Sequence, residues 1–217
     1  MSSEGHHFGI YGHRGSPRRR PENTVASFEE ALREGADGFE TDLRLLADGV
    51  AVLYHDDEAR GRPVESLTSA ELRAQPLRDL SRFAGKARMV LEVKRGGWEE
   101  RLMAEVSGWP DIVVASFDHA LIGELARRKA AFPLGVTVSG VLVDLPAYAK
   151  RLGATWCFPD HHHVSESLVR ALHDAGMTVV PWTVNQPRDW DRLREFGCDG
   201  MITDDPAAAV AWRAQWG

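Results

Sequence analysis

The chain has 217 residues, 43% of them hydrophobic, and a formal net charge of −6. This composition supports a full hydrophobic core, and the length is at the short end for one (β/α)8 barrel, so we expect a single domain over residues 1–217. The acidic balance argues against broad nucleic-acid binding. No apolar run reaches the roughly 18 residues of a membrane span, and no leader pattern precedes the first strand, so we expect a cytoplasmic protein.

Short β-rich runs alternate with helical patterns along the chain. The predicted strands cover residues 6–11, 38–45, 89–94, 112–117, 134–138, 155–159, 178–184 and 200–203. The predicted helices cover residues 24–34, 98–108, 120–129, 144–152, 166–175, 187–196 and 207–215. This alternation indicates an α/β protein with parallel strands joined by helical crossovers. Eight strands close a barrel, so we predict a TIM-type (β/α)8 barrel.

One segment interrupts the alternation after the second strand. Residues 50–54 form a further apolar run, and Asp48 and Gly49 precede it, which is a hairpin signal. If these two residues alone form the turn, His55 pairs opposite Asp42. The hairpin would then return His55 to the mouth of the barrel, beside an acidic strand end.

Charged residues gather at the carboxyl ends of the predicted strands, where TIM barrels place their active sites. Glu40 and Asp42 are two residues apart and point to one side of the sheet, as do Glu92 and Lys94. Buried carboxylates are costly unless they are paired or bind a cation. A hard divalent ion, Mg²⁺ or Ca²⁺, fits Glu40, Asp42 and Glu92. The alternative is an internal salt-bridge layer with Arg14 or Lys94.

Two histidines flank this group of carboxylates in the sequence. His13 ends the first predicted strand, and His55 follows the predicted hairpin. Histidine has the side-chain pKa nearest neutrality, so both are candidate proton carriers. The histidine run at residues 161–163 precedes a helix and has few acidic neighbours, so we interpret it as a surface loop.

Nine short motifs follow one another between residues 12 and 206. They are Gly12-His13-Arg14-Gly15, Pro21-Glu22-Asn23-Thr24, Glu40-Thr41-Asp42, Asp48-Gly49, His55-Asp56, Glu92-Val93-Lys94, Ser116-Phe117, Trp182-Thr183-Val184-Asn185 and Asp199-Gly200-Met201-Ile202-Thr203-Asp204-Asp205-Pro206. In this order the set resembles that of the glycerophosphodiester phosphodiesterase family. Each motif alone is weak evidence, whereas nine in order are specific.

The resemblance implies roles for individual residues of the site. Glu40, Asp42 and Glu92 would bind a divalent metal ion, while His13 and His55 would act as acid and base. Arg14 and Lys94 would contact the phosphate, and Arg14 would thereby assist catalysis.

Other residues of the motifs have a second interpretation beside the functional one. Phe117 and Trp182 would either line a pocket for the alcohol or pack at the top of the barrel. Glu22 and Asn23 would support the metal site, although Asn23 could also be the N-cap of the first helix. The motifs of residues 182–185 and 203–204 would organise the rim.

The resemblance implies metal-dependent hydrolysis of a small-molecule glycerophosphodiester to an alcohol and glycerol 3-phosphate. One alternative is a lysophospholipase D-like enzyme that uses the same site on lysophospholipids. Another is a non-catalytic barrel that binds phosphorylated polyols, which would be expected to lack a carboxylate or histidine that this chain retains. The segment 57–91 is shorter than is usual in the family, so we expect an open mouth and weak discrimination among headgroups. The sequence leaves the oligomeric state and the order of acid and base open.

Overall fold

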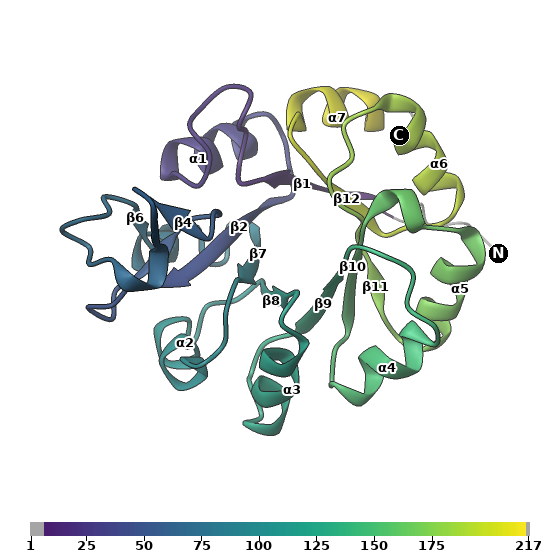
Figure 1. Ribbon diagram of the computed structural model, residues 1–217. Helices are drawn as coiled ribbons and strands as arrows, with labels where there is room; N and C mark the ends of the chain where they lie inside the picture. Colours follow the sequence, from purple (N-terminus) through teal and green to yellow (C-terminus); the bar gives the residue numbers. More distant parts are fainter. Residues whose placement is uncertain (1–6, 216–217) are drawn as a thin grey trace.

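Parallel strands form the centre of the structure, a computed structural model that describes residues 7–215 (Figure 1). Eight of them follow one another around a ring in chain order: β1 (Gly9–His13), β2 (Gly38–Leu45), β7 (Arg88–Val93), β8 (Ile112–Ser116), β9 (Leu134–Val138), β10 (Trp156–Pro159), β11 (Thr178–Val179) and β12 (Gly200–Thr203). The predicted (β/α)8 barrel is therefore confirmed. The first strand begins at Gly9, later than predicted, and His6 lies outside the described residues.

The ring closes between β11 and β12 through backbone hydrogen bonds. The N–H of Asp199 donates to the carbonyl of Val179 at 3.0 Å, and that of Ile202 donates to Pro181 at 2.9 Å. The N–H of Val184 donates to Ile202 at 2.8 Å. The predicted strand over residues 178–184 is regular only at its start, because Pro181 has no N–H to donate to a neighbouring strand.

Helices surround the ring and cover its outer face (Figure 1). They are α1 (Val25–Arg33), α2 (Glu99–Glu105), α3 (His119–Arg127), α4 (Leu145–Arg151), α5 (Glu166–Asp174), α6 (Pro187–Glu195) and α7 (Pro206–Arg213). Side chains of Thr24, Asp118, Ser165 and Asp205 accept hydrogen bonds from the first turns of four of them, which explains why these helices start where they do. Among the helices of residues 7–215, none is long and apolar enough to cross a membrane. The expected cytoplasmic location stays a prediction.

Aromatic side chains pack in the layer between the strands and the helices. Phe39 of β2 stacks on Phe28 of α1 at 4.1 Å between ring centroids, and Phe83 packs edge-on against Phe39 at 5.1 Å. Phe28 and Phe39 are fully buried. This outer layer fixes β2, the strand that carries Glu40 and Asp42, against α1.

The inside of the barrel is apolar at its base. Tyr11, Val90, Phe158 and Ile202 belong to one buried cluster contributed by different strands. A Cβ on Gly135 would lie 2.5 Å from the Phe158 ring, so glycine is needed there to make room for it. Because side chains alternate along a strand, the residues two positions further on point to the same side and form the next layer up. That layer holds the candidate site.

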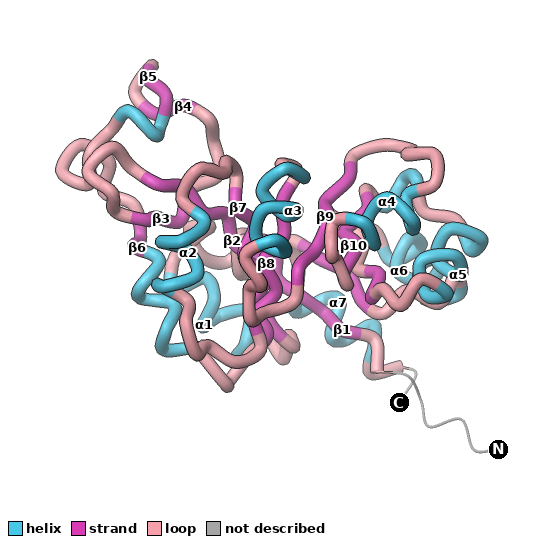
Figure 2. Tube along the Cα trace, turned by 90° about the horizontal axis from the view of Figure 1, so that it is seen from below, coloured by secondary structure: helices cyan, strands magenta, loops and turns pink. Residues whose placement is uncertain are grey.

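A segment between β2 and β7 extends beside the ring, at the end of the molecule opposite the two termini (Figure 2). It contains β3 (Ala51–Leu53), β4 (Glu58–Ala59), β5 (Arg62–Pro63), β6 (Gln75–Pro76) and two 3₁₀ helices, Val64–Ser66 and Leu77–Phe83. Val52, Val64 and Leu67 pack with Leu46 in a small core of their own. This segment forms one wall beside the mouth of the barrel.

The predicted hairpin is present, but its turn has three residues instead of two. The N–H of Leu46 donates to the carbonyl of Val50 at 2.9 Å, which leaves residues 47–49 in the turn, with Gly49 at φ +79°. Asp48 accepts hydrogen bonds from the backbone and hydroxyl of Ser69, at 2.9 and 2.7 Å. A three-residue loop that ends in a left-handed glycine is a common alternative to the two-residue turn, and Gly49 supplies that glycine.

The longer turn shifts the strand pairing by one residue. Leu43 pairs with Leu53, and the N–H of Tyr54 donates to the carbonyl of Asp42 at 3.0 Å. The prediction that His55 lies opposite Asp42 is therefore wrong. A shift of one residue exchanges the two faces of a strand, so it changes where each side chain after the hairpin points.

We expect Phe39→Ala to lower the free energy of unfolding by about 3–5 kcal/mol, because it removes a fully buried ring with two aromatic neighbours. Urea unfolding followed by circular dichroism measures this loss. Phe117→Ala is the control, since the Phe117 ring is 44% exposed and its removal should cost far less. Equal losses in the two variants would show that the aromatic layer does not anchor β2.

Candidate functional site

Three carboxylates meet at the carboxyl ends of two neighbouring strands. Glu40 and Asp42 come from β2 and Glu92 from β7, and Asp42 pairs directly opposite Glu92 in the sheet. One oxygen atom from each carboxylate lies within 4.8 Å of the others. Glu40 and Asp42 are buried. The structure thus brings together the three residues that the sequence predicts as metal ligands.

Two cations neutralise part of this group. Lys94 Nζ lies 2.7 Å from Asp42 Oδ1 and also pairs with Glu92. Arg14 Nε lies 3.3 Å from Asp42 Oδ2. Burial alone would raise the pKa of Asp42, but the charges of Lys94 and Arg14 outweigh it and lower that pKa below its ordinary value.

Among residues 7–215, no Lys or Arg forms an ion pair with Glu40. It accepts a hydrogen bond from the backbone N–H of Arg14 at 3.1 Å, and His13 Nε2 is 4.0 Å away. Burial, followed by the negative charges of Asp42 and Glu92, raises the pKa of Glu40 well above its ordinary value. A salt-bridge layer therefore accounts for Asp42 and Glu92 but leaves Glu40 uncompensated.

The donor set fits a hard divalent cation. All three candidate ligands are carboxylates, they are close enough to share one ion, and they carry one more negative charge than Lys94 and Arg14 neutralise. A bound cation would stabilise the ionised form of Glu40. This charge balance favours a metal site over an internal layer of salt bridges alone.

The turn after β1 directs backbone and side-chain groups toward the carboxylates. Arg14 adopts a left-handed conformation, with φ 55°, and Gly15 follows at φ 92°. A Cβ on Gly15 would lie 2.4 Å from Ser27 Oγ, so only glycine allows this close approach to α1. The turn points the N–H of Arg14 at Glu40, which is the kind of strained backbone that functional sites contain.

Asn23 supports the site and does not cap the first helix. Its Nδ2 donates to Asp42 Oδ2 at 2.8 Å, and its Oδ1 accepts from the hydroxyl of Thr41 at 2.7 Å. Thr24 is the N-cap of α1. Of the two interpretations of Asn23, the structure therefore has the one in which Asn23 supports the carboxylates. Glu22 accepts a hydrogen bond from Arg14 Nη1 at 2.9 Å.

His13 is oriented by a partner that the sequence did not identify. Its Nδ1 lies 2.6 Å from Asp204 Oδ1, and Asn185 Nδ2 donates to Asp204 Oδ2 at 2.6 Å. Burial pulls the pKa of Asp204 upward, but the hydrogen bond and charge of His13 outweigh it and lower that pKa. The sequence does contain a sign of this role, because Asp204 comes two residues after Ile202, which faces the inside of the barrel, and is therefore expected on the same face.

His55 lies outside this group of contacts. It lines a neighbouring groove of about 290 Å³ together with Glu22 and Asn23. Its Nδ1 is 2.8 Å from Asp56 Oδ1, and within residues 7–215 this is its only ion pair. The structure therefore places His13 beside the carboxylates. His55 lies in an adjoining groove whose lining includes Asn23, the residue that donates a hydrogen bond to Asp42.

Aromatic residues line the mouth above the carboxylates. Trp182 borders a narrow cavity of about 20 Å³ with His13, Glu40 and Glu92. Phe117 packs edge-on against Trp182, with 5.4 Å between ring centroids. The indole N–H of Trp182 donates to the carbonyl of Phe158 at 2.9 Å, which fixes the ring. Trp182 therefore packs at the barrel top and also borders the cavity, while its role in binding the alcohol stays a prediction.

Other polar clusters are separate from this site. Asp160, His161 and His162 also place possible ligand atoms within 4.8 Å of one another, and His161 is buried, unlike a surface-loop residue. Arg192 Nη2 lies 3.5 Å from His161 Nδ1, and its positive charge disfavours a metal ion there.

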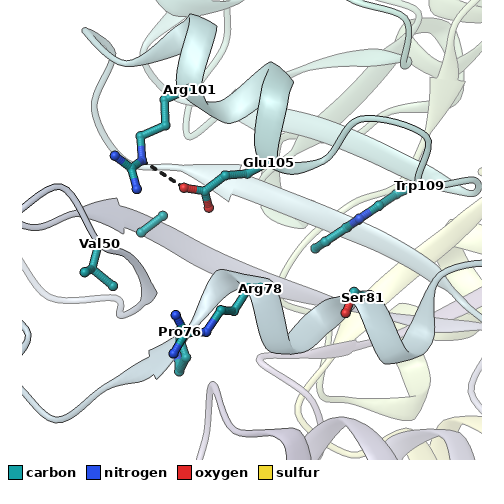
Figure 3. Close-up of a pocket in the computed structure, with 8 residues that line it drawn as sticks. Val50, Pro76, Arg78, Ser81, Arg101, Glu105 and Trp109 are labelled. Atoms are coloured by element: carbon teal, nitrogen blue, oxygen red, sulfur yellow. Dashed lines mark hydrogen bonds and ion pairs between the residues drawn. The ribbon is translucent and has the colours of Figure 1, made fainter.

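A larger groove of about 420 Å³ lies between the hairpin and α2 (Figure 3). Arg101 and Glu105 pair with each other along α2 at 2.8 Å on one side of the groove, and Val50 and Trp109 also line it. None of the candidate catalytic residues lines it. The size of this groove is therefore no guide to the position of the chemistry.

Comparisons with known proteins agree with the geometry. The glycerophosphoryl diester phosphodiesterase family matches residues 13–88 and 83–208. The chain belongs to this family. A glycerophosphodiester phosphodiesterase from Caldanaerobacter subterraneus is 27% identical, over 93% of this chain and 96% of that protein.

Solved structures show the same fold. A glycerophosphodiester phosphodiesterase from Parabacteroides distasonis is 25% identical with a TM-score of 0.82, and the match covers 97% of this chain and 98% of that one. A phosphodiesterase from Oleispira antarctica, solved in complex with the product sn-glycerol-3-phosphate, is 21% identical with a TM-score of 0.86, over 95% and 96% of the two chains. The predicted membership of the glycerophosphodiester phosphodiesterase family is confirmed, as is the reaction class of a phosphoric diester hydrolase.

We expect Glu40→Gln to raise the melting temperature of the metal-free protein at neutral pH. The pKa of Glu40 is higher in the folded chain than in the unfolded chain, so the wild type loses stability as pH rises above the ordinary carboxyl pKa. The difference should vanish at acidic pH, where Glu40 is protonated in both states. Thermal unfolding with a chelator across pH tests this, and a lower melting temperature at neutral pH would contradict it.

Proposed function

We propose that this chain hydrolyses glycerophosphodiesters to an alcohol and glycerol 3-phosphate with the help of a divalent metal ion. The observation that carries the proposal is the close group of Glu40, Asp42 and Glu92, the first two buried, beside a histidine held by a carboxylate. Family membership and the product bound to the Oleispira antarctica structure support the substrate class. The substrate is a small molecule that enters from the barrel mouth.

Glu40, Asp42 and Glu92 would hold the ion, with Mg²⁺ and Ca²⁺ as the candidates because all donors are hard oxygen atoms. When bound, the ion would stabilise negative charge on the phosphoryl oxygens. Lys94 and Arg14 already lie beside the carboxylates and carry fixed positive charge. Their place in the reaction is to bind the phosphate and to stabilise charge that develops on it.

His13 and His55 would move the protons. One histidine takes the proton of the attacking hydroxyl, and the other gives a proton to the leaving alkoxide. The 2.6 Å contact of His13 Nδ1 with Asp204 supports a fixed ring whose Nε2 faces Glu40. His55, paired with Asp56 in the adjoining groove, would approach the substrate from the side of the wall segment. Weak discrimination among headgroups stays a prediction.

Removal of any metal-binding carboxylate should abolish activity. We expect Asp42→Asn and Glu92→Gln each to reduce kcat by about 1000-fold or more, because the charge that holds the ion is lost. Chelation of the wild type should do the same, and added Mg²⁺ or Ca²⁺ should restore activity. The activity is measured as hydrolysis of glycerophosphocholine, with detection of the glycerol 3-phosphate that is released.

Glu166→Gln is the matched control for the metal experiment. Glu166 is an exposed carboxylate on α5, where it pairs with Arg170 away from the site. Its loss should leave kcat within about twofold of the wild type. Full activity after exhaustive chelation would refute metal dependence.

Both catalytic histidines should be needed for turnover. We expect His13→Ala and His55→Ala to lower kcat by about 100-fold or more, with metal binding largely retained. Asp204→Asn should lower kcat as well, because the His13 ring loses its anionic partner. The pH profile of kcat should be bell-shaped.

His163→Ala is the control for the histidine variants, because His163 is an exposed histidine outside the proposed site. It should retain kcat within about twofold of the wild type. If His55→Ala kept wild-type turnover on a diester with a poor leaving group, His55 would not be a proton carrier.

A further inference from the structure

Arg44 is a buried cation that lies outside all of the sequence motifs. It is on β2, two residues after Asp42, so its side chain projects from the same face of the strand as those of Glu40 and Asp42. The side chain of Arg44 is only 2% exposed. A buried charge is costly unless it is paired, so the partners of this guanidinium indicate what it holds in place.

The guanidinium of Arg44 binds three acceptors in the wall segment. Its Nη2 donates to the backbone carbonyl of His55 at 2.9 Å and to Asp57 Oδ1 at 2.6 Å. Its Nη1 donates to Oε1 of Glu65, in the first 3₁₀ helix of the segment, at 2.5 Å. Arg44 therefore attaches the chain at His55, and the residues that follow, to a strand of the barrel.

The backbone around His55 is attached to β2 at two successive residues. Strand β3 ends at Leu53, so regular strand pairing does not continue to His55. The N–H of Tyr54 donates to the carbonyl of Asp42 at 3.0 Å, and the next carbonyl along the chain, that of His55, accepts from Arg44. These two contacts set the distance of the His55 backbone from the strand that carries two of the carboxylates.

The side chain of His55 depends on its backbone for its position. The side chain is 38% exposed, and its ion pair is with Asp56, the next residue of the same loop, at 2.8 Å. A partner on the same loop moves with the histidine and cannot fix it relative to the barrel. His13, in contrast, is held by Asp204 from beyond the end of a different strand.

We propose that Arg44 is a positioning residue for His55 and sets the place of this imidazole relative to the carboxylates of β2. Arg44 acts through the carbonyl of His55 and through Asp57, without contact with the substrate. The inference rests on the proposed function, in which His55 moves a proton. A catalytic group that is misplaced by about 1 Å can lower turnover about 100-fold, so such an anchor matters for the rate.

The alternative is that Arg44 only stabilises the wall segment. It pairs with Val52, which belongs to the small core of that segment. However, Nε of Arg44 is buried and makes no hydrogen bond within residues 7–215. A well-packed apolar side chain is often at least as stabilising as a buried ion pair, and it would leave no polar atom unpaired. A role in position accounts for the arginine better than a role in stability does.

The test is hydrolysis of glycerophosphocholine by Arg44→Met, His55→Ala and the double variant. Arg44→Met should lower kcat by about 10- to 100-fold and change KM by less than about threefold, because the histidine is misplaced while the phosphate site is intact. In the His55→Ala background, Arg44→Met should lower kcat by less than about twofold further, since no imidazole is left to position.

A conservative variant provides a second measurement. Arg44→Lys should have a kcat between those of the wild type and Arg44→Met, because lysine keeps the charge but lacks the planar fork that binds several acceptors at once. Its loss of kcat should also disappear in the His55→Ala background. If Arg44→Met does not fold, Arg44→Lys takes its place in the comparison with His55→Ala.

Arg213→Met is the matched control. Arg213 also donates to a backbone carbonyl, that of Phe8 at 2.8 Å, and pairs with a carboxylate, Asp37. These contacts lie at the amino ends of the strands, away from the candidate site. Arg213→Met should keep kcat within about twofold of the wild type even if its melting temperature falls. A loss of kcat as large as that of Arg44→Met would attribute both effects to lowered stability and overturn the inference.

The other outcomes separate this inference from the proposed function. If His55→Ala is impaired but Arg44→Met is not, or if the two losses multiply in the double variant, the inference is wrong and the proposed function stands. Wild-type turnover in His55→Ala would overturn both the proton-carrying role of His55 and the inference. Failure of the wild type to hydrolyse glycerophosphodiesters with Mg²⁺ or Ca²⁺ present would overturn the proposed function and the inference together.

Discussion

The close approach of three carboxylates at the top of the barrel, two of them buried and Glu92 partly buried, is the constraint on which the rest of the site depends. Ionised carboxylates in a low-dielectric interior repel one another, and each loses its hydration. Lys94 and Arg14 compensate Asp42 and Glu92 through direct contacts, but Glu40 receives only a backbone N–H and a distant imidazole. The raised pKa of Glu40 expresses this imbalance, and a divalent cation is the simplest partner that removes it.

The neighbouring structure serves to hold these charges in place. Asn23 bridges Asp42 and Thr41, and the left-handed turn at Arg14 directs an N–H to Glu40. Below them, the barrel interior is packed with apolar side chains, including the Phe158 ring that Gly135 accommodates. A rigid base of this kind allows a polar layer to be maintained above it, because the strands cannot separate to let the charges move apart.

The mouth of the barrel has two different sides. On one side, the wall segment after β2 carries His55 beside polar residues such as Glu22 and Asp56. On the other, the loop after β9 and Phe117 form an uncharged groove. A diester that lies across the carboxylates would thus have a polar surface toward one of its ends and an apolar surface toward the other. This asymmetry follows from loops that the barrel itself does not constrain.

The sequence by itself determined the alternation of strands and helices, the barrel and the residues of the inner polar layer. Those features depend on local periodicity and on the rule that carboxyl ends of parallel strands meet at one edge, so Glu40, Asp42, Glu92 and His13 could be found without coordinates.

Only the tertiary structure decided the contacts that depend on distant segments. The Asp48-Gly49 pair is compatible with a two-residue or a three-residue hairpin turn, and the folded chain has the longer one, with Asp48 hydrogen-bonded to Ser69, so that His55 lies outside the predicted pairing. Asp204 reaches His13 only because β12 closes on β1, which brings together residues separated by 191 positions. Strand periodicity is a local property of the backbone, whereas pairing register and side-chain partners are set by packing between parts of the chain that sequence rules treat separately.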